Sequence, residues 1–347
     1  MRLRSLLVLG TAALLLMSGC APEPTPIPTA SPSESTSPTP TPTPTPDPIV
    51  EPDAAFDVTC DDVAVEMAAL VGEPSTPVEP VMSAISTPGW LPGPGQYMFQ
   101  RAGGIACSAG DDGRHWEVTI VPDAPTVIAG AEERQGWSGE RAECSEGGCQ
   151  FELVDSDVLL SAAVYDPALG ADDTGLVEES LRRLVARAAA TVREVEYVDS
   201  DVVGASCEHF VTPEQVAERA GEEVVVFSDF GGWGIPAEVY RYVNGSRICY
   251  YTSADGDLGS LRSYLMLTTL PAGAWAFERL GGEPVEVEGA DAAKVSAGEH
   301  GEKILDMRVG PDWIRLMTYD NGSGASDPLP LAETVARNLT VGHTAPE

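Results

Sequence analysis

Apolar and polar positions follow one pattern twice along residues 53–347. Each copy opens with apolar residues that recur at three- or four-residue steps, which predicts a helix. These residues are Val63, Met67 and Leu70 in the first copy, and Phe210, Val216 and Ala220 in the second. Each predicted helix begins at a cysteine, Cys60 or Cys207, and ends where a glycine follows, at Gly72 or Gly221. A pattern that recurs at this length indicates two similar domains.

A tryptophan-containing loop follows each predicted helix, with Trp90 in the first copy and Trp233 in the second. Each loop leads into two short apolar stretches that predict a β-hairpin. The paired strands are residues 97–100 with 105–107, and residues 239–243 with 248–250. In the second copy the turn is Asn244-Gly245, a strong hairpin signal because both central residues of such a turn need positive φ.

The remainder of each copy alternates strands and helices. A strand at residues 116–121 or 264–269 precedes a short helix, and further strands and a last helix follow. This order predicts an α+β fold. We expect two tandem repeats, each a mostly antiparallel sheet covered by helices and stapled by a helix–strand disulfide. Repeat 1 is placed at residues 53–197 and repeat 2 at residues 198–347.

The N-terminal residues have the composition of an export signal. Arg2 and Arg4 precede an apolar run, residues 6–17, that is too short to span a bilayer as a helix. This pattern predicts a lipoprotein signal peptide at residues 1–19. The sequence Leu16-Met17-Ser18-Gly19-Cys20 resembles the lipobox of bacterial lipoproteins, which implies cleavage before Cys20 and acylation of its thiol, as with palmitate. The alternative is an ordinary secretory signal with a stray cysteine.

Residues 20–52 comprise the lipidated Cys20 and a stretch rich in proline and threonine. Proline fixes φ and removes backbone donors, so this stretch is unable to join a sheet or continue a helix. We expect an extended polyproline II tether that rises about 3.1 Å per residue. Its threonines leave O-glycosylation open.

The overall charge limits the partners. The chain has 54 acidic and 20 basic residues, for a formal net charge of −34. Binding to nucleic acid or to an anionic membrane surface needs clustered lysine and arginine, so we expect no nucleic acid partner. Contact with the membrane is expected only through the N-terminal lipid.

The cysteines indicate disulfides. Without Cys20, six of the seven cysteines remain, an even number in an exported chain. The repeat places Cys60 and Cys107 as it places Cys207 and Cys249, which predicts those two pairs. Cys144 and Cys149 are left for each other across a short loop. The alternative, a metal site, lacks a Cys-x-x-Cys pair and a histidine at ligand spacing, so we expect no metal and no cofactor.

The second copy contains the sequence Cys207-Glu208-His209-Phe210-Val211-Thr212-Pro213-Glu214-Gln215-Val216, which ends at Gly221 and is followed by a cysteine on a strand. This motif resembles a family of actinobacterial cell-envelope lipoprotein domains with no assigned function. Related envelope domains are similar to the PsbP-type α/β/α sandwich and include extracellular sensor domains of receptor kinases. The resemblance brings no catalytic residues with it.

Catalytic motifs are absent from the sequence. It contains no His-Glu-x-x-His and no Gly-x-Ser-x-Gly, and its four histidines have no ligand spacing. Acidic pairs such as Asp111-Asp112 lie at predicted turns and lack the spacing of a calcium-binding loop. We therefore expect that the protein is not an enzyme.

Aromatic residues provide the candidate binding surface. Tyrosines crowd the second predicted hairpin, and tyrosine offers a large contact area at low entropic cost. The candidates are Tyr240, Tyr242, Tyr250, Tyr251, Trp233 and Trp90. The alternative is structural: the tyrosines stabilise the sheet by cross-strand pairing, and the two tryptophans plug one end of each core.

These features together predict a lipoprotein on the extracytoplasmic face of the cell membrane. We expect a non-catalytic binding or interaction module of the cell envelope, which binds an envelope protein or a small-molecule or lipid ligand. The alternatives are a small-molecule or lipid carrier and an envelope hydrolase with a spatially assembled site. A hydrolase should show a carboxylate or histidine of shifted pKa in a cleft, and a carrier an apolar cavity of about 300–1,000 Å³. The crevice between the two repeats and the tyrosine-rich sheet of the second copy are the places to look.

Overall fold

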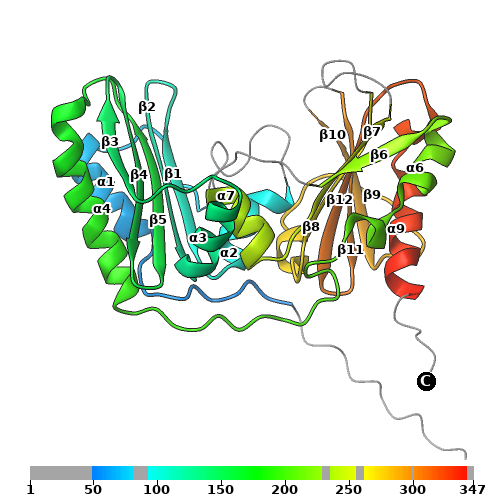
Figure 1. Ribbon diagram of the computed structural model, residues 1–347, viewed down its shortest axis with the longest axis horizontal. Helices are drawn as coiled ribbons and strands as arrows, with labels where there is room; N and C mark the ends of the chain where they lie inside the picture. The colour runs from blue at the N-terminus through cyan, green and yellow to red at the C-terminus, as the bar shows by residue number, and fades with distance from the viewer. Residues whose placement is uncertain (1–48, 81–92, 229–234, 255–261, 299–300, 342–347) are drawn as a thin grey trace, which may run out of the picture. The chain divides into compact units, whose positions relative to one another are not determined.

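The computed structural model describes residues 49–80, 93–228, 235–254, 262–298 and 301–341 (Figure 1). The expected signal peptide, Cys20 and most of the expected tether lie outside these residues, and so do Trp90 and Trp233. Residues from Pro48 to Glu347 form one compact unit. This unit contains two antiparallel sheets with covering helices, which confirms the predicted α+β class.

The first sheet has five strands in the order β1-β2-β5-β4-β3, with every neighbouring pair antiparallel. They are β1 (Ile105–Asp111), β2 (Arg114–Pro122), β3 (Arg141–Ser145), β4 (Gly148–Asp155) and β5 (Val158–Tyr165). Helices α1 (Cys60–Val71) and α4 (Thr174–Ala189) lie along one face, as Figure 1 shows, and a short helix η2 (Ala171–Asp173) precedes α4. They enclose a core around Trp116 and Phe151.

The second sheet has seven strands in the order β6-β7-β8-β12-β11-β10-β9, again all antiparallel. They are β6 (Val224–Phe227), β7 (Ile248–Ser253), β8 (Ser263–Leu270), β9 (Glu283–Pro284), β10 (Ala292–Ala297), β11 (Lys303–Val309) and β12 (Asp312–Thr318). One face is covered by α5 (Cys207–Phe210), α6 (Pro213–Ala220) and α9 (Leu329–Val341), and η4 (Gly324–Ser326) precedes α9.

The two sheets share one connectivity. Without its edge strands β6 and β9, the second sheet has the order β7-β8-β12-β11-β10, which matches β1-β2-β5-β4-β3 in the first. The short helices α3 (Ala124–Glu133) and α8 (Ala274–Phe277) each follow the second strand of their set. The repeat read from the sequence is therefore also a repeat of strand order.

The disulfides have the predicted partners. Cys60 at the start of α1 is joined to Cys107 in β1, and Cys207 at the start of α5 is joined to Cys249 in β7. The two pairs have the same Cα–Cα distance, 5.6 Å. Cys144 and Cys149 are joined across the β3–β4 hairpin, where they lie directly opposite each other. Each sheet is thus stapled to the helix at the start of its own repeat.

Both helix starts carry a capping box. In α6, the N–H of Gln215 donates to the Thr212 hydroxyl, and the Gln215 side chain accepts from the N–H of Thr212. In α1, Thr59 and Asp62 make the same reciprocal pair. The predicted single helix from Cys207 to Ala220 is instead two helices, because the chain is extended where α6 is capped.

The first strand of each predicted hairpin is wrong: both segments are helical. Residues 94–101 form η1 (Pro94–Tyr97) and α2 (Met98–Arg101). Residues 235–243 form α7 (Ile235–Glu238), which continues into a π-helical turn, η3 (Val239–Val243). The second strands, β1 and β7, are correct. The physical reason is burial, because Phe99 and Tyr240 enter an apolar core instead of lying on a sheet surface.

Asn244-Gly245 ends η3 and makes no hairpin turn. Asn244 is fully buried, and its side-chain amide donates to the carbonyl of Met98 at 2.8 Å. Gly245 has a φ of +61°, and a Cβ there would lie 2.9 Å from the backbone nitrogen of Gly204. The same two residues thus connect η3 to α2 and to the chain before α5.

The helices that replace the hairpins build a core shared by both repeats. Repeat 1 contributes residues of β2, β5, α2 and α3, and repeat 2 contributes residues of β7, β8, β11, β12, α7 and η3. The members include Phe99, Val121, Val127, Leu159, Val239, Tyr240, Ile248, Met266, Ile304 and Met317. In the part of the chain that the structure describes, none of the helices has the length and apolar character that a membrane crossing needs.

Candidate functional site

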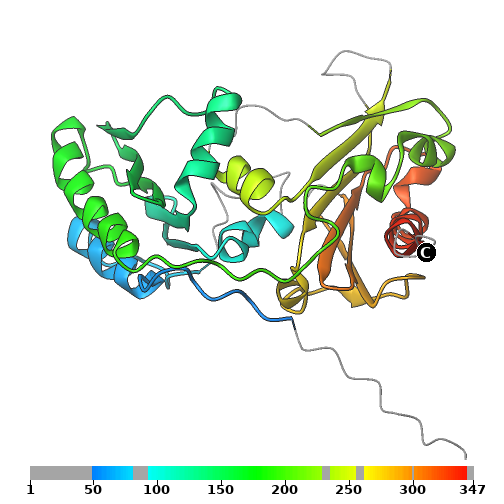
Figure 2. The ribbon, with the colours of Figure 1, turned by 60° about the horizontal axis from the view of Figure 1, so that its bottom comes forward.

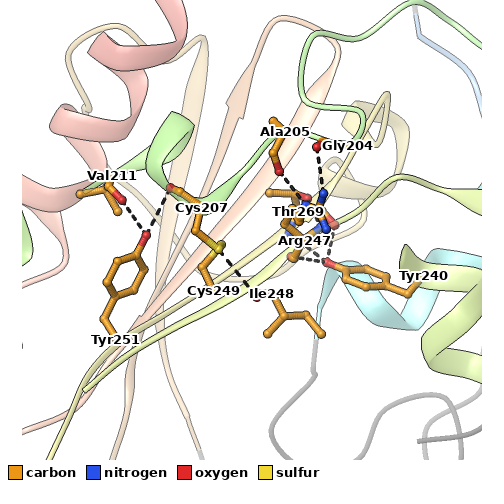
Figure 3. Close-up of a disulfide and its surroundings, with 10 residues drawn as sticks. All are labelled: Gly204, Ala205, Cys207, Val211, Tyr240, Arg247, Ile248, Cys249, Tyr251 and Thr269. Atoms are coloured by element: carbon orange, nitrogen blue, oxygen red, sulfur yellow. Dashed lines mark hydrogen bonds between the residues drawn. A yellow bond between two sulfur atoms is a disulfide. The ribbon is translucent and has the colours of Figure 1, made fainter. Parts of the chain in front are cut away.

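Two tyrosines of the expected binding surface are interior residues. Tyr240 and Tyr251 are 1% and 0% exposed, and burial raises the pKa of both phenols. The Tyr251 hydroxyl donates to the carbonyl of Val211 at 2.6 Å, which holds the end of α5 against β7 (Figure 3). The Tyr240 hydroxyl accepts from the N–H of Thr269 at 2.9 Å and connects η3 to β8. The prediction that these two side chains form a surface is therefore wrong.

The other two tyrosines reach solvent but also have packing roles. Tyr250 is half-buried and packs edge-on against Tyr319, with ring centroids 6.5 Å apart. Tyr242 is 40% exposed, and its hydroxyl donates to Glu133 Oε2 at 3.1 Å. Its ring lies so close to Gly130 of α3 that an added Cβ would be 2.6 Å away. Tyr242 thus attaches η3 to α3.

The expected crevice between the repeats is filled where the structure describes it. The shared core occupies this contact, and a buried ion pair crosses it. Arg134 Nε lies 3.0 Å from Glu238 Oε1, with side-chain exposures of 9% and 3%. A buried pair of this kind disfavours separation of the repeats, because opening would leave each charge without its partner.

A pocket of about 530 Å³ lies where four parts of the chain meet. Residues 50–54, which precede α1, form one side. Residues 193–198, in the linker between α4 and α5, form another, and Arg101 and Ala272 complete the wall. The first two segments run side by side in Figures 1 and 2, and the N–H of Arg193 donates to the carbonyl of Ala55 at 2.7 Å. We name this site the Arg101 pocket.

Arg101 is a buried charge with unused donors. It lies at the end of α2 and is 3% exposed. Its guanidinium carbon is 4.3 Å from the centroid of the Tyr197 ring, and its Nε donates to the carbonyl of Pro271 at 3.1 Å. Among the described residues, neither of its terminal nitrogens has an acceptor. Burial lowers the pKa of the guanidinium, but an arginine remains protonated at neutral pH.

Two other buried arginines contact a carboxylate. Arg315 makes two hydrogen bonds to Asp306, from Nε at 2.7 Å and from Nη2 at 2.9 Å, and Arg134 pairs with Glu238. Burying a charge is costly unless it is paired and hydrogen-bonded. Arg101 departs from that rule, and an anion in the pocket would complete its hydrogen bonds.

Asp312 interacts with Arg101 electrostatically, but its hydrogen bonds are made to other residues. Its Oδ1 accepts from the Ser200 hydroxyl at 2.6 Å and from the N–H of Ala272 at 2.7 Å. Burial raises the pKa of Asp312 to about 6, and nearby Asp201 adds to the rise, whereas Arg101 opposes it. A carboxylate in direct contact with a guanidinium would instead have a lowered pKa. Asp312 therefore fixes the linker, and among the described contacts no hydrogen bond or ion pair joins it to Arg101.

Asp312 and Ser200 also line a second pocket, of about 410 Å³. A carboxylate of raised pKa in a pocket is the feature expected of a hydrolase. Here the Ser200 hydroxyl donates to Asp312 and accepts from the N–H of Val202 at 3.2 Å, so its bonds shape the loop before α5. The arrangement is that of a loop anchor.

The rest of the Arg101 pocket has an apolar wall and an acidic rim. Val50, Tyr197 and Val198 line it and are 67%, 44% and 47% exposed, which is unusual for large apolar side chains. The exposed lining residues Asp53, Glu194 and Glu196 are acidic. Among the described residues, no group of three or more histidine, cysteine, aspartate or glutamate side chains is placed to hold a metal ion.

Arg101 was not among the residues singled out from the sequence, although a signal for it exists. Met98, Phe99 and Ala102 are spaced as on one face of a helix, and Gly103, with a φ of +74°, follows as a stop. That spacing would have predicted a helix here, with Arg101 next to its buried face. Nothing local indicates that Arg101 lacks a carboxylate.

Comparisons with known proteins add no name to this site. No protein-family model, no curated protein and no solved structure matches the chain. The function must therefore be argued from the pocket itself.

Proposed function

We propose that the protein is a lipid-anchored, extracytoplasmic binding module of the cell envelope, which is non-catalytic and takes a small molecule in the Arg101 pocket. One observation carries this proposal: Arg101, which is 3% exposed, lines a pocket of about 530 Å³, and no described residue accepts from its two terminal nitrogens. Pockets of about 300–1,000 Å³ with a few placed polar groups are typical small-molecule sites. This supports a ligand of that size over a large protein partner.

The location in the proposal has separate support. Three disulfides indicate an oxidising, extracytoplasmic compartment. The membrane anchor rests on the lipobox-like sequence that ends at Cys20. A chain anchored there would enter the described unit beside the pocket, because Ile49 packs against the aromatic cluster around Trp275, and Glu51 forms an ion pair with Arg279.

Native mass spectrometry tests the proposal. The sample is the mature chain, residues 20–347, exported behind an ordinary secretory signal with Cys20→Ser and its disulfides intact. We expect one adduct per chain that is lost on denaturation and is missing from the Arg101→Met variant. An exposed arginine provides the matched control: Arg182 pairs with Glu140 and Glu178, so Arg182→Met should keep the adduct. A bare mass for the parent chain, purified gently, would contradict the proposal.

A further inference from the structure

We propose that the ligand of the Arg101 pocket is an amphipathic monocarboxylate, with its carboxylate on Arg101 and its hydrocarbon body on Val50, Tyr197 and Val198. This inference rests on the proposed function and adds the chemical class of the ligand. Three features of the pocket carry it: the buried guanidinium, the exposed apolar wall and the acidic rim.

The guanidinium selects the head group. Nε of Arg101 already donates to Pro271, which leaves the two terminal nitrogens as donors. Their planar arrangement matches the two oxygens of a carboxylate, and such charge-assisted pairs are stronger than neutral hydrogen bonds. A neutral hydroxyl would leave the buried charge uncompensated.

The apolar wall selects the body. Val50 and Val198 are among the most exposed large apolar side chains of the described residues, at 67% and 47%, and the Tyr197 ring centroid lies 4.3 Å from the guanidinium carbon of Arg101. A hydrocarbon chain laid against them would remove apolar surface from water on both sides. That gain grows with each methylene group that is buried.

The rim excludes a second negative charge. Asp53, Glu194 and Glu196 are exposed on the lining, so the far end of a dianion would meet carboxylates. Arg193 also lines the pocket, but its Nη1 donates to Asp57 at 2.8 Å and its Nη2 to the carbonyl of Ala54 at 2.8 Å. It therefore offers little compensation to a second anionic group, and inorganic phosphate or a dicarboxylate should bind poorly.

Calorimetric titration with four matched probes tests this class. Octanoate has both features, octan-1-ol lacks the charge, butyrate lacks the length, and suberate carries a second carboxylate on the same number of carbons. We expect octanoate to bind at least about tenfold more tightly than each of the others, since a charged hydrogen bond or a few buried methylenes is worth that factor. The experiment uses the mature Cys20→Ser chain at low ionic strength, because exposed charges are screened by salt.

Variants separate the three contributions. Arg101→Met should weaken octanoate by about tenfold or more and leave octan-1-ol unchanged. The double variant Val50→Ser/Val198→Ser retains Arg101 and changes only exposed side chains, so it tests the wall without threatening the fold. The double variant Glu194→Gln/Glu196→Gln should raise the affinity for suberate to within about threefold of the affinity for octanoate. Misfolding would not produce such a gain in affinity. Arg182→Met is again the matched control.

The outcomes distinguish this inference from the proposed function. If suberate binds the parent chain as tightly as octanoate, or if Arg101→Met binds octanoate normally, the monocarboxylate inference is overturned. If no probe binds but the native adduct is present and depends on Arg101, the inference fails and the proposed function stands. If neither an adduct nor probe binding is found, both fail.

Discussion

Arg315 and Arg101 bury the same chemical group in two different ways. Arg315 lies on β12 directly opposite Asp306 on β11, is 9% exposed, and makes two hydrogen bonds to that carboxylate. Arg101 is 3% exposed, and among the described residues its guanidinium has one hydrogen-bond acceptor, the Pro271 carbonyl, and one aromatic ring over it, that of Tyr197. The first arrangement is complete within the protein, whereas the second has room for an anion.

The difference shows how a buried charge can be structural or available. Asp306 also accepts from the Trp313 indole at 2.7 Å, and Gly93 passes so close to the Arg315 guanidinium that any side chain there would clash. At Arg101 the carboxylate that comes nearest in electrostatic effect, Asp312, is held by Ser200 and Ala272. Three experiments test this contrast between Arg315 and Arg101.

Arg315→Met should have the largest effect on stability. It leaves the Asp306 carboxylate buried without its partner, so we expect the free energy of unfolding to fall by about 3–5 kcal/mol. Chemical denaturation followed by tryptophan fluorescence measures this. The double variant Arg315→Met/Asp306→Asn should recover part of the loss, because the uncompensated charge is then gone. A loss below about 1 kcal/mol would show that the Arg315–Asp306 pair contributes little to the stability of the fold.

Asp312 should make the free energy of unfolding depend on pH. Its folded pKa, about 6, is raised above its ordinary value, so the folded state holds this proton more tightly than the unfolded state does. The contribution of the Asp312 proton to the free energy of unfolding is full at low pH and is lost as pH rises through about 6. The loss is on the order of 3 kcal/mol in total, most of it between about pH 4 and 7. Asp312→Asn should remove this component.

The measurement is denaturant unfolding of the parent chain and of Asp312→Asn at several pH values. The difference between the two curves isolates this one carboxylate from the others. If the two chains lose the same stability between pH 4 and 7, Asp312 is ionised at no cost. Its carboxylate would then be available to Arg101, and the contrast with Arg315 would weaken.

Arg101→Met should have the smallest effect on stability. The variant loses one hydrogen bond and one cation–π contact but also removes an uncompensated buried charge, so we expect a change within about 1 kcal/mol. The same denaturation assay measures it beside Arg315→Met. A loss as large as that of Arg315→Met would mean that Arg101 is a structural residue, and it would remove the basis for a ligand in the pocket.

Much of the fold could be predicted from local sequence and from the repeat. The repeat alone selected the partners of Cys60 and Cys207, because equivalent cysteines have equivalent places. Thr212 carries a complete capping signal for the start of α6. These features depend on residues close together in the chain or on the comparison of one copy with the other.

The hairpin predictions were wrong because two local sequence signals favour different structures. Asn244-Gly245 favours a hairpin turn, but Val239, Tyr240 and Val243 have helical spacing, and burial in the shared core decided for the helix. The predicted tyrosine surface was also wrong, because an alternating pattern does not show whether both faces of a strand are covered. Tyr251 lies on a strand that is covered by α5.

The two-copy organisation, the α+β class and the disulfide pairs could be predicted from the sequence, because each follows from local stereochemistry or from symmetry between the copies. The tertiary structure placed a core in the space between the repeats, and it brought Arg101 to a pocket where none of the described carboxylates pairs with its guanidinium. Arg101 and the carbonyl it bonds, Pro271, are 170 residues apart. Whether a buried charge is paired depends on such distant neighbours, and no local pattern encodes them.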